Sequence, residues 1–239
     1  MSWDCSRGGP DPRGGPDPSG GAATTVTGEM AESTSTRDLL LDAAARLYAE
    51  RGIDNVSLAE IVRAARQRNA SAVHYHFGSR DDVLRALLAR HVPVIAERRH
   101  RLLEEARARP DDDARSAVEA IVRPVTEFAQ RGWRERAYLQ IGSELAEAVD
   151  RTTPELRALL AQTEGHQAWA LLRRRCPTDP DDLWRVRQEI SIAFIGRAAA
   201  DRARRLDRGD EGEVLSDDRF VDNLVDMVMG AMTAAHAGG

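Results

Sequence analysis

Apolar residues recur at a spacing of three or four along most of the chain after about residue 34, which is the pattern of amphipathic helices. Short polar residues that can cap a helix, and glycines that can end one, divide the first part of this pattern into three short helices and one longer helix. The boundary residues are Ser35 and Gly52 for the first helix, Ser57 with Glu60 for the second, Asn69 and Gly78 for the third, and Ser79 with Asp82 and about Arg107 for the fourth. Pro93 predicts a bend in the fourth helix.

The remainder of the chain predicts further helices separated by Gly, Pro and Asp. Their expected ranges are 113–131, 134–149, 154–175, 181–206 and 217–235. Pro124 predicts a kink in the first of these, and a loop at 207–216 makes the last two a natural antiparallel pair. No segment has the alternation of a convincing strand, so the predicted fold class is all-α.

Residues 1–33 differ from the rest in composition. They contain two tandem copies of RGGPDP, at Arg7–Pro12 and Arg13–Pro18, and have too few apolar residues to offset the entropy of an ordered chain. We therefore predict a disordered tail at 1–33, a three-helix unit at 34–80 and a larger helical domain at 81–239.

Charge is distributed unevenly along the chain. The net charge of −5 argues against a polyanionic partner for the molecule as a whole. Between Ser57 and Arg80, however, the local net charge is +3. The residues that carry it are Arg63, Arg66, Arg68 and Arg80 against Glu60.

The positions of the cysteines and the hydropathy of the chain indicate the cellular compartment in which the protein is expected. Cys5 and Cys176 form neither a disulfide framework nor a metal-ligand spacing, which indicates a reducing environment. No apolar run approaches the roughly 20 residues that span a bilayer. We expect a cytoplasmic protein with no membrane partner.

The run RNASAVHYHFGSR, which begins at Arg68, has the features of the second helix of a helix-turn-helix. Such a helix needs short side chains toward the DNA, apolar residues behind them and phosphate donors at the rim. The short side chains are those of Ala70, Ser71 and Ala72, and Val73 and Phe77 are expected to face the core. The expected donors are His74, Tyr75, His76, Arg66, Arg68 and Arg80.

Residues from about Arg37 to His91, roughly a quarter of the chain, resemble the TetR/AcrR family of bacterial regulators. The resemblance is carried by TRDLLLDAAARLYAERG, then SLAEIVRAA, then VHYHF and a GSRDD-like start of the fourth helix. It implies a helix-turn-helix DNA-binding domain at 34–80 and a C-terminal domain at 81–239 that binds a small effector and dimerises. The implied protein is a homodimer that binds operator DNA and usually represses transcription until the effector arrives.

The resemblance also implies roles for individual positions. Asn69 corresponds to the cap of the recognition helix, Ser71 and Ala72 to side chains that approach the bases, and His74 and Tyr75 to aromatics along the DNA backbone. Ser57 matches a capping residue that often bonds a phosphate. The turn departs from the family, because Arg66-Gln67-Arg68 is one residue longer than usual and lacks Gly, which leaves open which residues read bases.

The C-terminal domain offers candidates for an effector pocket and a dimer interface. The candidate pocket residues are the aromatics Phe128, Trp133, Tyr138, Trp169 and Trp184. The last two helices are apolar over more of their circumference than one partner helix covers, which predicts a second subunit. The candidate interface residues are Ile190, Phe194, Arg197, Phe220, Leu224, Val225, Val228 and Met232.

Other classes of function find little support in the residues. His74 and His76 would point about 200° apart on a helix, so they cannot share a metal ion. No grouping of nucleophile, base and acid stands out, and we expect neither an enzyme nor a bound cofactor. The alternative is an all-helical small-molecule binder or adaptor whose N-terminal unit mediates protein contacts.

Overall fold

The computed structural model of the chain describes residues 25–68, 75–147, 153–176, 180–210 and 215–235, with side chains from Thr36 onward. Residues Asn69, Ser71, Ala72, Val73 and His74 lie outside this part of the chain. The chain divides into two compact units, Met1–Ser35 and Thr36–Gly239.

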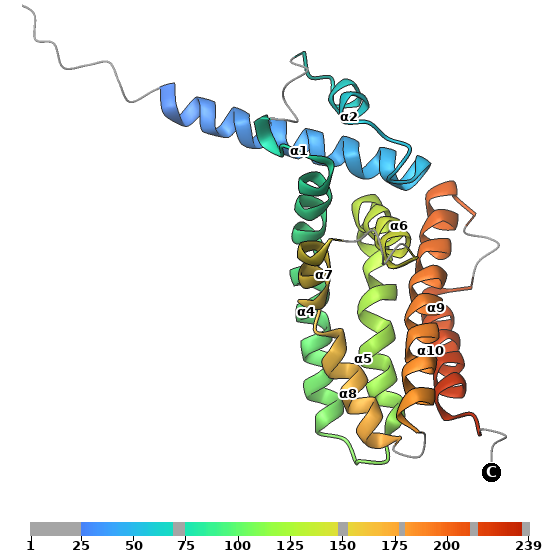
Figure 1. Cartoon of the computed structure of the whole chain (residues 1–239). Helices are drawn as coiled ribbons and strands as arrows, with labels where there is room; N and C mark the ends of the chain where they lie inside the picture. The colour runs from blue at the N-terminus through green and yellow to red at the C-terminus, as the bar shows by residue number, and fades with distance from the viewer. Residues whose placement is uncertain (1–24, 69–74, 148–152, 177–179, 211–214, 236–239) are drawn as a thin grey trace, which may run out of the picture. The chain divides into compact units, whose positions relative to one another are not determined.

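The described residues form helices and no strands, which confirms the all-α prediction (Figure 1). The helices are α1 (Thr25–Arg51), α2 (Leu58–Ala64), α4 (Arg80–Arg107), α5 (Ala114–Thr126), the 3-10 helix η1 (Glu127–Arg131), α6 (Trp133–Glu147), α7 (Pro154–Ala161), α8 (Gly165–Arg175), α9 (Asp181–Arg208) and α10 (Asp217–Thr233). None of the helices in this part of the chain combines the length and hydropathy that a membrane span requires.

Local capping signals predicted several boundaries correctly. Ser57 caps α2 and Ser79 caps α4, each accepting a hydrogen bond from the backbone N–H three residues later. Gly52 and Gly78 follow helical residues with φ of +84° and +78°, a region that glycine adopts without steric cost.

The predicted start of the first helix at Ser35 was wrong. Helix α1 begins at Thr25 and therefore includes residues 25–33, which were assigned to the tail. Glu29, Met30 and Glu32 favour the helix intrinsically, and Ser35 is tolerated inside it.

The prediction of one helix at 154–175 was also wrong. The chain breaks into α7 and α8 around Glu164, which has a left-handed φ of +58°. The hydroxyl of Thr163 donates to the carbonyl of Leu160, so the turn closes on itself before α8 begins at Gly165. The kink expected at Pro124 takes the form of a change from α5 to η1 at Glu127.

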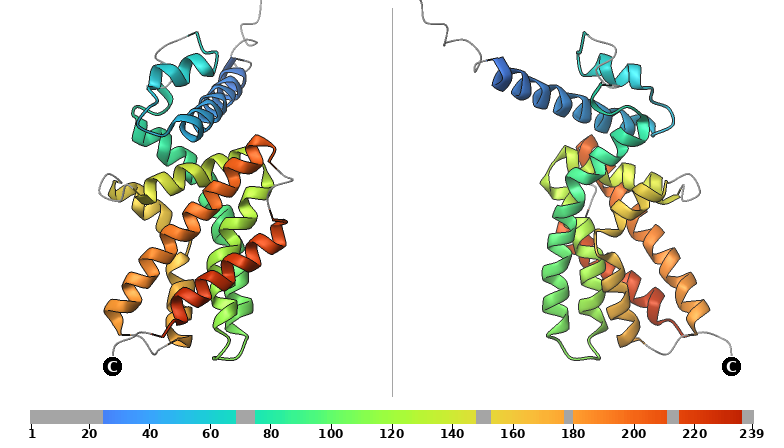
Figure 2. Two further views of the ribbon diagram at one scale, coloured as in Figure 1. Left: turned by 90° about the vertical axis from the view of Figure 1, so that its right-hand side faces the viewer. Right: turned by 60° about the vertical axis from the view of Figure 1, so that its left-hand side comes forward.

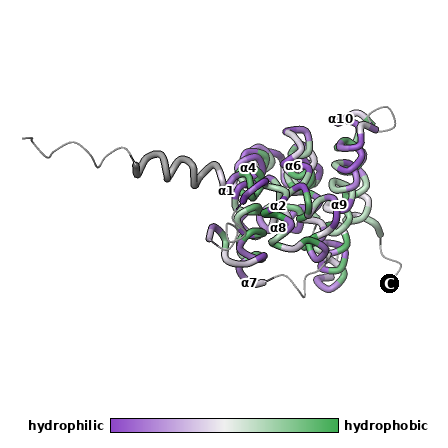
Figure 3. The backbone as a smooth tube through the Cα atoms, turned by 90° about the horizontal axis from the view of Figure 1, so that it is seen from above, coloured by the Kyte–Doolittle hydropathy of each residue, from purple (hydrophilic) through white to green (hydrophobic). Residues whose placement is uncertain are grey.

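Two groups of buried side chains stabilise the second unit, and α4 contributes to both. The first includes residues of α1, α2, α6 and the start of α4, among them Leu88. The second joins the end of α4, including Leu103, to α5, α8, α9 and α10. Helix α4 runs beside α5 in both Figure 1 and Figure 2. In Figure 3, which colours the backbone by hydropathy, the hydrophobic stretches lie mostly toward the middle of the view.

The argument that the α10 stripe needs a second subunit was wrong for most of its residues. Four of the candidate interface side chains are at most 2% exposed within this chain alone. They are Leu224, Val225, Val228 and Met232. Helix α10 packs against both α5 and α9, so two helices of the same chain cover this face. Phe220 is half-buried, with the Arg202 guanidinium 4.5 Å from its ring centroid.

Candidate DNA-binding surface and ligand cavity

The start of α2 is held by a reciprocal pair of hydrogen bonds. The Ser57 hydroxyl oxygen accepts from the Glu60 backbone N–H at 3.3 Å, and the Ser57 backbone N–H donates to Glu60 Oε2 at 2.9 Å. These bonds lower the pKa of Glu60, with the bond from the Ser57 backbone as the largest cause. The Ser57 side chain therefore has a capping role, as predicted from its spacing to Glu60.

The unusual turn after α2 contains a strained arginine. Arg66 has φ of +55°, a left-handed conformation that costs a residue with a Cβ about 1–2 kcal/mol. Its backbone N–H donates to the carbonyl of Arg63 at 3.0 Å, and that of Gln67 donates to Val62 at 3.1 Å. This pair of bonds is the Schellman ending of a helix, in which the left-handed position is usually glycine. Arg66 therefore occupies the place where the resembling family has Gly.

Basic and aromatic side chains near this turn are open to solvent. Arg63, Arg66 and Arg68 are exposed, and Tyr75 is 83% exposed with its ring edge-on to His76. Phe77, two residues after Tyr75, is buried, as predicted. The described residues on either side of 69–74 thus present three guanidinium groups and a phenol to solvent, next to the buried Phe77.

Arg80 differs from the other basic residues in its contacts. Its Nη2 donates to the carbonyl of Val56 at 3.0 Å, and its Nη1 lies 3.8 Å from Asp54. The side chain therefore links the start of α4 to the loop before α2 and is less available to phosphate than Arg68.

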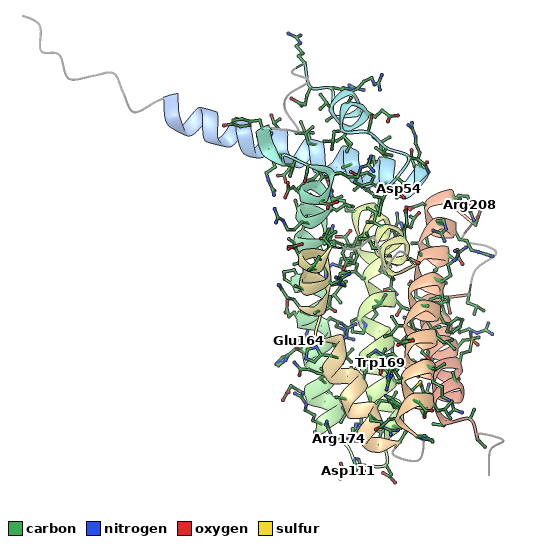
Figure 4. All side chains as sticks on the ribbon, viewed as in Figure 1. Asp54, Asp111, Glu164, Trp169, Arg174 and Arg208 are labelled. Atoms are coloured by element: carbon green, nitrogen blue, oxygen red, sulfur yellow. The ribbon has the colours of Figure 1, made fainter. Side chains whose placement is uncertain are left out.

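A cavity of about 420 Å³ lies among α4, α5, α6, α7, α8 and α9. Its described walls are mostly apolar, with contributions from Ile95, Ile192 and Trp169. Trp169, which is labelled in Figure 4, belongs to α8. Gly142 of α6 and Gly196 of α9 also line it, and a Cβ at either position would meet no atom within 4 Å. Small residues inside two long helices thus leave room for a molecule of drug-like size.

Two of the five candidate pocket aromatics, Tyr138 and Trp169, line this cavity. The other three are placed elsewhere. Phe128 belongs to the buried group that includes α1 and α2, and Trp133 lies under the guanidinium of Arg46 at 3.8 Å. Trp184 belongs to the second buried group, where Arg173 lies over its ring.

Sequence reasoning missed the main polar residue of the cavity, Arg99. It occupies the apolar face of α4, four residues after Ile95 and three before Leu102, and is 5% exposed. Burial lowers the pKa of Arg99 to about 10, which leaves it charged at neutral pH. A single arginine on an otherwise apolar helix stripe was the signal that could have identified it.

The cavity is connected to the helix-turn-helix core through aromatic contacts. Tyr138, which lines the cavity, packs on the buried His91 of α4 with ring centroids 5.2 Å apart. Phe128 contacts both rings at 5.5 Å. Burial lowers the pKa of His91 and raises that of Tyr138 to about 12, so both side chains are neutral at pH 7. Four residues before His91, Leu87 belongs to the same buried group as α1 and α2.

Comparison with protein families identifies this arrangement. Residues 40–87 match the model of the family described as "Bacterial regulatory proteins, tetR family". The chain carries the N-terminal domain of the TetR family. This match supports a DNA-binding transcriptional regulator.

The similarity of this chain to solved structures concerns the fold alone. AmtR of Mycobacterium smegmatis is 18% identical, with a TM-score of 0.53 over 84% of this chain and 87% of that one. The TetR family regulator PfmR of Thermus thermophilus is 20% identical, with a TM-score of 0.49 over 84% of this chain and 98% of that one. LfrR of Mycobacterium smegmatis, solved with proflavine, is 22% identical, with a TM-score of 0.43 over 85% and 98%. No curated protein sequence matches this chain significantly.

Proposed function

We propose that this regulator is a homodimeric repressor that binds a near-palindromic operator and leaves it when a small molecule occupies the cavity. The observation that carries the proposal is the course of α4. Leu84 and Leu88 near its start are buried with α1 and α2, whereas Ile95 and Arg99 line the cavity. A ligand that moves the middle of α4 would therefore move the anchor of the DNA-binding helices.

The proposed DNA-binding residues fall into three groups. Arg66, Arg68 and Tyr75 are exposed and suited to phosphate contacts, and Ser57 and Arg80 support the helix ends. Asn69, Ser71, Ala72 and His74 remain proposals from the resemblance. We retain 34–80 as the DNA-binding domain and 81–239 as the effector-binding and dimerisation domain.

The proposed dimer surface is the outer face of α9. Ile190 is 63% exposed and Phe194 is 36% exposed, one turn apart on the same face, and Arg197 continues it. Val186 and, on α10, Met227 add further exposed apolar side chains. Apolar groups at this spacing on an exposed helix are typical of a surface that a second subunit covers.

The decisive experiment is a shift assay with the DNA upstream of the protein's own gene, repeated over a series of salt concentrations. We expect binding to a near-palindrome with half-sites about 34 Å or a multiple of it apart, and an affinity that falls steeply with salt. Absence of salt-sensitive binding would favour the alternative of a helical small-molecule binder or adaptor. A shift that is reversed by a cell extract depleted of protein would support control by a small effector.

A further inference from the structure

The chemistry of the cavity walls indicates what kind of molecule the cavity accepts. Arg99 is the charged side chain among the described lining residues, and none of those residues is acidic. Around it the walls are mostly apolar, and the other lining residues with polar side chains are Tyr138, Ser143, Thr163, His166 and Gln188. Folding removed water from this cation, and an anionic ligand would restore a favourable electrostatic interaction with it. The cavity therefore favours an anionic ligand.

The guanidinium of Arg99 is held in place without an acidic partner among the described residues. Its Nε donates to the carbonyl of Ala120 at 3.1 Å, Nη2 donates to Ile121 at 3.5 Å, and Nη1 donates to the carbonyl of Thr163. The Ala120 carbonyl is available because Pro124, four residues later, has no N–H to donate to it. The nearby carboxylate of Glu164 lies instead 3.6 Å from His100 Nδ1.

These bonds use three of the five N–H groups of the guanidinium. One N–H on each terminal nitrogen is left, enough for the two hydrogen bonds that a carboxylate can accept from one arginine. The neutral phenol of Tyr138, which makes no hydrogen bond with the described residues, can donate a further one. The position of Arg99 is thus fixed before a ligand arrives, which lowers the entropy cost of binding.

We propose that the effector is an organic monoanion whose carboxylate is bound by Arg99. The apolar walls of the cavity enclose its alkyl or aromatic body. This inference rests on the proposed function, in which the cavity is the effector site. A carboxylate fits better than a phosphate monoester, because Arg99 is the one arginine among the described lining residues and the second negative charge of the phosphate would have no second guanidinium to bind.

The test compares ligands that differ only in the head group. Calorimetry and Trp fluorescence measure ligand binding to the full chain without DNA. The ligands are decanoate, decanamide, decylamine and decyl phosphate, and phenylbutyrate with its amide and amine. We expect the acids to bind about 10- to 100-fold more tightly than the amides, as is usual for hydrogen bonds to a charged group. Equal binding of acid and amide, tighter binding of the amine or the phosphate, or no binding by either acid would overturn the proposal.

Three variants locate the binding site. Arg99→Gln should reduce the preference for acid over amide to within a few-fold, whereas Arg101→Gln, which removes an exposed charge two residues away, should leave it unchanged. Gly196→Leu should fold, because a side chain there meets open space and leucine favours the helix, and should abolish binding by filling the cavity. Acid binding that survives Gly196→Leu would place the site elsewhere and overturn the proposal.

Failure of this inference can be distinguished from failure of the proposed function. Operator binding is measured in the same preparations by the shift assay, without added ligand. A protein that binds its operator but no acid contradicts the carboxylate proposal alone. A protein that binds the acid at this cavity but no DNA contradicts the repressor proposal and leaves the ligand class standing.

Discussion

At the scale of single residues, the turn after α2 carries a measurable strain. Replacing Arg66 by Gly should increase the free energy of unfolding by about 0.5–1 kcal/mol, because glycine adopts φ of +55° at little cost. The increase is smaller than the full strain energy, because glycine also raises the conformational entropy of the unfolded chain. Urea unfolding measures the change. The matched control is Arg63→Gly inside α2, which should destabilise by about 1 kcal/mol. A destabilised Arg66→Gly protein would refute the account of this turn.

A second residue-scale prediction concerns His91. Burial is the largest cause that lowers its pKa in the folded protein, with the charges of Arg90 and Arg134 acting in the same direction. As the pH falls below about 6.5, the unfolded chain takes up a proton that the folded chain resists, so stability is lost. His91→Phe should therefore reduce the loss of stability between pH 7 and about pH 5.5.

The control for His91 is Val92→Ala, which removes part of a neighbouring buried side chain and changes no ionisable group. Denaturant unfolding at several pH values should show the same pH dependence for this variant as for the unmodified chain. If His91→Phe also left the slope unchanged, burial of a neutral imidazole would not explain the acid sensitivity.

At the scale of helices, α9 and α10 expose different faces and should respond differently to charge. Replacing Ile190 and Phe194 by Glu places charges on an exposed face of α9. We therefore expect the proposed dimer to dissociate while the unfolding midpoint of the protomer is retained. Sedimentation velocity at several concentrations measures the change of mass.

Leu224→Glu provides the contrast on α10. Leu224 is 2% exposed inside the chain, so a carboxylate there would be buried without a partner. The free energy of unfolding should fall by about 3 kcal/mol or more, which is typical of a buried unpaired charge. Loss of the dimer with full stability after Leu224→Glu would show that α10 faces the partner subunit after all.

At the scale of the whole molecule, the first unit should contribute little to the stability of the second. Among the described residues the first fully buried side chain is Leu40, and the two units separate between Ser35 and Thr36. Deleting residues 1–33 should change the free energy of unfolding by less than about 1 kcal/mol. Deleting residues 1–42 also removes Leu40 and Leu41 and should destabilise by several kcal/mol, about 2–5 for each such leucine.

The uneven distribution of charge between the acidic chain as a whole and the basic residues near α2 should affect the salt dependence of DNA binding. Because the net charge is −5, affinity for DNA must come from the local group of arginines near α2. Arg68→Ala should weaken binding to all sequences and reduce the slope of log affinity against log salt by about one. Arg101→Ala on α4 is the control. A salt slope unaffected by Arg68 would remove it from the phosphate contacts.

The sequence alone determined the helical class, the ends of α2 and α4 and the glycine-terminated turns. These features depend on side chains and backbone groups within a few residues of each other, as in the Ser57 and Glu60 pair, and local spacing is therefore sufficient. The recognisable segment from about Arg37 to His91 determined the family in the same way, because its motifs are contiguous.

Only the tertiary structure decided which faces are covered and what the cavity contains. The stripe from Leu224 to Met232 is apolar enough for either a core or an interface, and the contacts of α10 with α5 and α9 made it core. Arg99 lies on the cavity wall because Pro124 freed a carbonyl on α5 and the turn before α8 supplied another. Such partners are distant in sequence, and burial depends on which helices meet. The local pattern could single out Arg99 on its helix stripe, but it could not show that Arg99 lines a cavity.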